Sequence, residues 1–183
     1  MNGEESEMKQ EYYGKYRGIV MNNIDPEQRG RIQVVVADVP TLIPPTWAMP
    51  CLPVGGIQNG MFTVPPIGAG VWVEFEQGDT DYPIWVGCYW GSAAEVPALA
   101  KLTPPGVPGI TMQTFLQNGI IVNDVPGPAG GIILKSTTNA SIIVNDTGIY
   151  IQNGKGASIL LVGPTITMSG QPVTINEGAL AVL

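Results

Sequence analysis

The chain has 183 residues, a formal net charge of −7 and no histidine, and Gly and Pro together fill 41 positions. Without histidine, Ser-His-Asp and Cys-His catalysis and histidine-ligated metals are excluded, and two cysteines cannot form a Cys₄ site. The acidic balance argues against a nucleic-acid partner. Because 44% of residues are hydrophobic and only 13% charged, we expect a folded chain. The many turn formers favour an all-β fold.

Residues 1–14 are polar and acidic, and we expect them to form a flexible arm. They lack the apolar core of a signal peptide, and no apolar run in the sequence is long enough to span a membrane. We therefore expect synthesis in the cytoplasm without a signal peptide.

Residues 15–91 predict a small closed barrel of short strands. The segment Val39–Val54 is rich in proline and is expected to be an extended loop. Apolar residues alternate with polar ones most clearly just before the turn at residues 78–81. Five strands are expected, at Tyr16–Met21, Gly30–Asp38, Gly60–Val64, Gly70–Glu76 and Tyr82–Trp90.

Residues 92–112 are rich in Pro and Gly and predict a linker, and residues 113–183 predict a second β domain. The second domain carries few charges: Asp124, Lys135, Asp146, Lys155 and Glu177. Its apolar residues recur in pairs two positions apart, separated by turn residues, which predicts six short strands with one apolar face. These paired residues are Ile132, Leu134, Ile142, Val144, Ile149, Ile151, Ile159, Leu161, Ile166, Met168, Val173 and Ile175.

A single copy of such a ribbon would leave its apolar face and two strand edges in water. Three copies around one axis would bury the apolar faces as a trimer core, and we expect each strand to pair with a strand of a neighbouring chain. The domain is thus predicted to be an intertwined trimeric β-helix, and the family resemblance given below supports the threefold order. Six strands stacked at ~4.8 Å would rise about 29 Å.

One group of residues has the chemistry for hydrolysis. Glu74, Glu76, Asp79 and Asp81 lie close together in sequence, and two carboxylates across a cleft can cleave a glycosidic bond. Their positions on a strand and in a hairpin turn favour solvated charges instead. We assign no catalytic residue, no metal ligand and no cofactor.

Three other sets each allow two interpretations. The aromatic residues Trp72, Trp85, Tyr89 and Trp90 either form a stacking platform for sugar or single-stranded nucleic acid, or serve packing, which the few basic residues favour. Cys51 and Cys88 are expected to be small buried residues rather than a redox pair. The basic residues of the first hairpin form either ordinary surface charge or a docking patch: Arg17, Arg29 and Arg31.

Three stretches within residues 15–91 resemble a known family. They are KYRGIVMNNIDPEQRGRIQVVV, WAMPCLPVGG and PPIGAGVWVEFEQGDTDYPIWVGCYWG. They are similar to the OB-fold domain of phage baseplate assembly protein V and of the spike proteins of type VI secretion. The strand-rich remainder is similar in style to the trimeric β-helical spike of that family.

The resemblance implies a homotrimeric central spike of a contractile phage tail or related injection particle, located in the baseplate. Its barrels would attach to the tail hub, with Arg17, Arg29 and Arg31 as docking residues, and its needle would pierce the target membrane. The fourteen residues before the barrel leave no room for a hub domain, so we expect a separate hub protein. The 21-residue linker likewise leaves no room for an inserted lysozyme.

Some relatives carry a His-x-His iron site at the apex, which this sequence lacks. The apolar end instead predicts contact with a PAAR-type tip protein through Leu180, Val182 and Leu183. Two other functions stay open from the residues alone: a trimeric glycan-binding fibre or adhesin, and a carboxylate-based cell-wall hydrolase.

Overall fold

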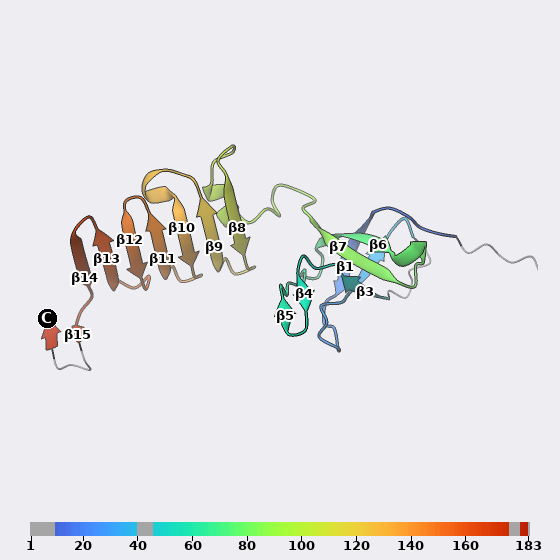
Figure 1. Ribbon diagram of the computed structural model, residues 1–183, viewed down its shortest axis with the longest axis horizontal. Coiled ribbons are helices and arrows are strands. Elements are labelled where there is room, and N and C mark those ends of the chain that lie inside the picture. The colour runs from blue at the N-terminus through green and yellow to red at the C-terminus, as the bar shows by residue number, and fades with distance from the viewer. Residues whose placement is uncertain (1–9, 40–45, 176–179, 183) are drawn as a thin grey trace, which may run out of the picture. The chain divides into compact units, whose positions relative to one another are not determined.

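A computed structural model of the protein describes residues 10–39, 46–175 and 180–182. The chain divides into two compact units, Met1–Glu95 and Val96–Leu183, which are described separately below. Its described elements are β-strands and three short 3₁₀ helices, η1 (Glu76–Gly78), η2 (Ala98–Leu102) and η3 (Gly127–Ala129), as the composition predicts (Figure 1). In these residues no helix has both the length and the hydrophobicity needed to cross a membrane.

The first unit is a closed five-stranded barrel, which confirms the expected OB-like domain. Its strands run in the order β1-β2-β3-β7-β6, and β6 closes the barrel by pairing with β1. The β3–β7 pair is parallel, and the other pairs are antiparallel. The strands are β1 (Tyr16–Asn22), β2 (Ile32–Val36), β3 (Trp47–Pro50), β6 (Gly70–Phe75) and β7 (Pro83–Tyr89).

Alternating apolar residues fill the barrel. In β2 and β6 every second side chain points inward, as the period of a strand requires. The indole N–H of buried Trp85 donates a hydrogen bond to the carbonyl of Gly30 at 3.1 Å, so its polar atom is satisfied inside. The core consists of Val20, Ile32, Val34, Val36, Val39, Ala48, Val71, Val73, Phe75 and Trp85.

Two predicted elements of the barrel were wrong. The segment expected as a loop contains β3, of which Pro50 is the last residue, and the N–H of the next residue, Cys51, donates to the carbonyl of Trp85 at 3.0 Å. The strand expected at Gly60–Val64 is absent. In its place β4 (Gly55–Gly56) and β5 (Asn59–Gly60) form a short hairpin, and the following residues up to Val64 are irregular.

Part of the N-terminal arm is docked on the barrel. The N–H of Tyr12 donates to the carbonyl of Gly78 at 2.8 Å. The ring of Tyr12 packs near Tyr16 and Phe75, with centroid separations of 6.1 and 6.2 Å. The expectation of a flexible arm therefore does not describe these residues, and residues 1–9 lie outside the described ones.

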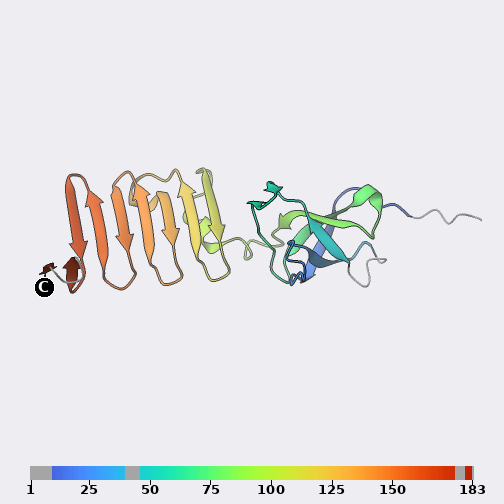
Figure 2. The ribbon, with the colours of Figure 1, turned by 60° about the horizontal axis from the view of Figure 1, so that its bottom comes forward.

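The second unit contains a seven-stranded antiparallel sheet in which the strands follow one another in chain order (Figure 2). Each strand hydrogen-bonds to its neighbours in sequence. The strands are β8 (Gly109–Gln113), β9 (Gly119–Asn123), β10 (Gly131–Lys135), β11 (Ser141–Asn145), β12 (Gly148–Gln152), β13 (Ser158–Val162) and β14 (Thr165–Ser169).

This sheet corrects the expected mode of pairing. The strands were expected to pair with those of neighbouring chains, yet in the structure one chain supplies both neighbours of every inner strand. The connections are short enough for consecutive strands to form hairpins, and such local pairing costs less loop entropy than pairing between chains. An intertwined β-helix is therefore not confirmed.

The end of the chain is also arranged differently from the six expected strands. β15 (Val173–Ile175) pairs with β16 (Leu180–Val182) in a separate two-stranded sheet. The apolar pair Val173 and Ile175 thus lies outside the seven-stranded sheet. The predicted tip residues Leu180 and Val182 lie in β16, and Leu183 lies outside the described residues.

Part of the expected linker packs on this sheet. Leu99 of η2 is buried, and its N–H donates to the side-chain carbonyl of Gln113 at 2.8 Å. A Cβ on Gly119 would lie 2.4 Å from Leu99 Cδ1, so a side chain at this position would displace Leu99. Ile121 of β9 is completely buried.

Candidate assembly surface

One face of the seven-stranded sheet carries two unbroken rows of apolar side chains, and we call it the two-row face. The strand register aligns one residue of each strand in the first row: Ile110, Val122, Ile132, Val144, Ile149, Leu161 and Ile166. The second row is Met112, Ile120, Leu134, Ile142, Ile151, Ile159 and Met168. Apart from half-buried Leu161, these side chains are 36–67% exposed.

The opposite face carries only one central row, which is better covered. Ile121 is fully buried, and Ile133, Ile143 and Leu160 are half-buried. Apart from Val162 and Lys135, the residues at the strand ends that flank this row are small or uncharged polar residues. Because exposed apolar area of this extent is rare on a monomer, the two-row face is the candidate for assembly.

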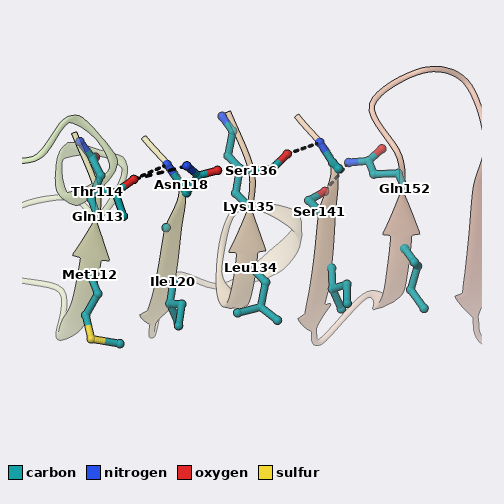
Figure 3. A pocket seen from close by; sticks show the side chains of 14 residues that line it. Met112, Gln113, Thr114, Asn118, Ile120, Leu134, Lys135, Ser136, Ser141 and Gln152 are labelled. Carbon is teal, nitrogen blue, oxygen red and sulfur yellow. Dashed lines mark hydrogen bonds between the residues drawn. The ribbon is translucent and has the colours of Figure 1, made fainter. Parts of the chain in front are cut away.

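The two-row face is hollowed near the loops that join its strands (Figure 3). Met112, Ile120 and Leu134 point the same way along a hollow of about 640 Å³. A hydrogen-bonded polar rim borders it: Asn118 N–H donates to Thr114 Oγ1 at 3.2 Å, Ala140 N–H to Ser136 Oγ at 3.1 Å, and Gln152 Nε2 to Ser141 Oγ at 2.8 Å.

A second hollow of about 750 Å³ continues the same face toward Met168 and Pro172. Since both floors are apolar and run across several strands, this is a surface for an extended partner rather than a small-molecule pocket.

The structure places ten of the twelve predicted core residues on the two-row face, and the other two in β15. The prediction missed the contributions of β8 and β9, namely Ile110, Met112, Ile120 and Val122. A signal for β9 was present, because Ile120–Asp124 repeats as Ile142–Asp146.

The acidic residues of the barrel take part in an ion pair and in a turn. Lys15 forms an ion pair with Glu74. In the turn after β6, Asp79 accepts the N–H of Asp81 at 3.0 Å and its own N–H donates to the carbonyl of Glu76. These bonds are those of a turn. Within the described ranges, no group of three or more His, Cys, Asp or Glu side chains is placed to hold a metal.

The four aromatic residues do not share one environment. Trp85 lies in the barrel core, whereas Trp90 is 63% exposed. Trp72 and Tyr89 pack against each other with ring centroids 5.1 Å apart. The guanidinium of Arg17 lies over both rings, at 5.4 and 5.3 Å. Their arrangement favours packing over a continuous stacking platform.

The predicted docking arginines also differ in their surroundings. Arg31 binds the Asp25 carboxylate with Nη2 at 2.7 Å and Nε at 3.1 Å, and the side chains of the pair are only 11% and 4% exposed. The hydrogen bond from Arg31 holds the pKa of Asp25 well below its usual range. Arg29 pairs with Glu27 at the surface. Arg31 thus stabilises the loop between β1 and β2. Hub docking by the three arginines stays a prediction.

The expectation of buried cysteines was wrong. Cys51 and Cys88 are both exposed and unbonded to each other. Both lie at the ends of barrel strands, where side chains leave the core, although partial burial still raises the pKa of the Cys88 thiol.

Two family models match the two units of the chain, the closed OB-like barrel and the sheet with the candidate assembly face. Residues 16–90 match the type VI secretion system/phage-baseplate injector OB domain, and residues 109–181 match the phage baseplate V C-terminal trimerisation domain. The chain belongs to the phage baseplate V family, with a spike-type structural role in the baseplate of a phage tail or type VI system. No curated protein matches the chain.

Proposed function

We propose that three copies of this chain form the central spike of a contractile injection machine, with their two-row faces packed around a threefold axis. Each seven-stranded sheet forms one side of a prism, and the fourteen residues of the two rows form its core. The observation that carries this proposal is the pair of unbroken apolar rows, exposed in a domain whose family model is a trimerisation domain.

The energetics support this arrangement. Burying the exposed part of one such side chain contributes about 1 kcal/mol, so fourteen contribute on the order of 14 kcal/mol per chain. Six spacings of ~4.8 Å between seven strands give a prism about 29 Å long. A closely hydrogen-bonded sheet with an apolar core suits an element that must transmit an axial load.

The finer role follows from the same features. The prism is the needle that crosses the target membrane when the sheath contracts, while the barrel attaches to a separate hub protein. Arg17 and Arg29 are the hub-docking candidates because both are exposed, whereas Arg31 is largely buried against Asp25. A tip protein of the PAAR type covers the end formed by β15 and β16.

Sedimentation velocity of the full chain at micromolar concentration tests the assembly, and a trimer resistant to SDS is expected. A stable monomer would refute the proposal. For the finer role, particles assembled with a trimer-deficient variant should contract yet fail to make target cells leaky. Leakage equal to that of wild-type particles would refute membrane piercing by this chain.

A further inference from the structure

The negative and positive charges of the C-terminal sheet lie on opposite sides of it. Each of these sides is formed by the ends of the strands and their connections, and we call them the two edges of the sheet. Between Gln113 and Ile175 the sequence has four charged residues, namely Asp124, Lys135, Asp146 and Lys155. Asp124 directly follows β9 and Asp146 directly follows β11. Those two strands end at the same edge, which we call the turn edge.

Both lysines lie at the opposite edge. Lys135 is the last residue of β10, where it pairs in register with Ser141, the first residue of β11. Lys155 lies in the connection between β12 and β13, which leaves from that same edge. Five-residue connections join the strands here, at residues 114–118, 136–140 and 153–157, and we call this the loop edge.

The four charges have no partner of opposite sign within the described part of the chain. The ion pairs of the described residues all involve barrel side chains. Asp146 accepts the N–H of Gly127 at 3.1 Å, which leaves its charge available. Asp124, Asp146 and Lys155 are exposed. Lys135 is half-buried, and its side chain extends away from the apolar row of Met112, Ile120 and Leu134 (Figure 3).

Cyclic symmetry determines which edges can meet. In a ring of three identical sheets, every corner joins the turn edge of one sheet to the loop edge of the next, because the contact is heterologous. Negative ends therefore meet positive ends at all three corners. The spacing is also compatible: Lys135 lies one strand after Asp124, and Lys155 lies between the first and the second strand after Asp146.

We propose that Asp124–Lys135 and Asp146–Lys155 ion pairs between neighbouring chains close the corners of the trimer. This inference rests on the trimer proposed above. One strand spacing of ~4.8 Å is within the reach of a lysine side chain. For the second pair, the position of Lys155 in a five-residue connection brings it between the first and the second strand after Asp146. The apolar rows supply the affinity between the chains. The charges favour the ring in which all three sheets run in the same direction, because joining two turn edges or two loop edges would bring like charges together.

A charge exchange at one corner tests the proposal. Lys155→Glu places a carboxylate opposite Asp146 at all three corners. We expect the rate of trimer loss in urea at low ionic strength to rise on the order of 10- to 100-fold, since three weak attractions become repulsions. Adding Asp146→Lys should return the rate to within about threefold of wild type, and molar salt should abolish the difference. Asp146→Asn is the matched control, because it keeps an acceptor for Gly127 while removing the charge.

The outcomes separate this inference from the proposed function. A wild-type chain that sediments as a monomer overturns the trimer itself. If Lys155→Glu does not change the stability of the trimer, or if the double variant is as unstable as Lys155→Glu alone, the corner pairs are refuted and the trimer is not. Loss in the single variant with recovery in the double supports both.

Discussion

Substitutions at neighbouring residues of β14 separate the two faces of the sheet. Ile166 belongs to the two-row face and is 66% exposed, and Thr167 is exposed on the opposite face. Because neither side chain is buried in the single chain, Asp at either position should leave the chain folded. We expect Ile166→Asp to abolish the trimer and Thr167→Asp to leave it intact.

The magnitude follows from the exposure of Ile166. Burying two thirds of an isoleucine contributes about 1–2 kcal/mol per chain, or about 3–6 kcal/mol per trimer. Three carboxylates brought into the core each cost several kcal/mol more. The total is on the order of 10 kcal/mol, which corresponds to about seven powers of ten in the assembly constant.

Sedimentation velocity of both variants measures this effect, with circular dichroism to verify the β structure. The variant Ile166→Asp should sediment as a folded monomer at concentrations where Thr167→Asp and wild type are trimers. If Ile166→Asp remains trimeric, or if both variants dissociate alike, the two-row face is not the trimer core.

Two further predictions concern stability of the single chain. Because Arg31 depresses the pKa of Asp25, the contribution of this pair to the free energy of unfolding is present above the unfolded carboxyl pKa of ~3.9 and is lost as pH falls through the folded pKa. Asp25→Asn should therefore lower the melting temperature at neutral pH and flatten the decline of the melting temperature in acid. An acid profile like that of wild type would contradict the role of the pair. At Gly131, with φ +93°, a Cβ would lie 2.2 Å from the carbonyl oxygen of Val144, whereas at Gly156, with φ +99°, it meets open space. Gly156→Ala should cost about 1 kcal/mol of unfolding free energy from the backbone alone and Gly131→Ala clearly more, and equal urea midpoints would refute the steric argument.

The barrel could be predicted largely from sequence, because alternation of apolar residues marks strands with one buried face. That signal is clear in Gly70–Phe75 and in Ile32–Val36. It failed for β3, where Pro50 masks a strand of four residues. The alternation of apolar and polar residues also does not reveal how exposed a residue is at the end of a strand. For this reason the predicted burial of Cys51 and Cys88 was wrong.

The C-terminal sheet shows a different limit. Paired apolar residues predicted its strands and the side chains of one face, because the strand period alone determines which residues share a face. The same pattern carries no information about which chain provides the neighbouring strand. The pairing of strands within one chain could therefore not be predicted from the sequence. The positions of Asp124 and Lys135 at opposite edges follow from that pairing and could not be predicted either.

Because the number of strands is odd, the first and the last strand of the sheet run in the same direction, and the chain enters and leaves the sheet at opposite edges. The chain enters at the turn edge at Gly109 and leaves at the loop edge at Ser169. Inserting one strand before β11 would reverse every later strand and carry Asp146 to the loop edge. Inserting a hairpin preserves the edges and adds two spacings, about 9.6 Å. Spikes built on this plan should therefore differ in length by whole hairpins, and the 22-residue repeat from Ile120 to Ile142 has the size of one such step.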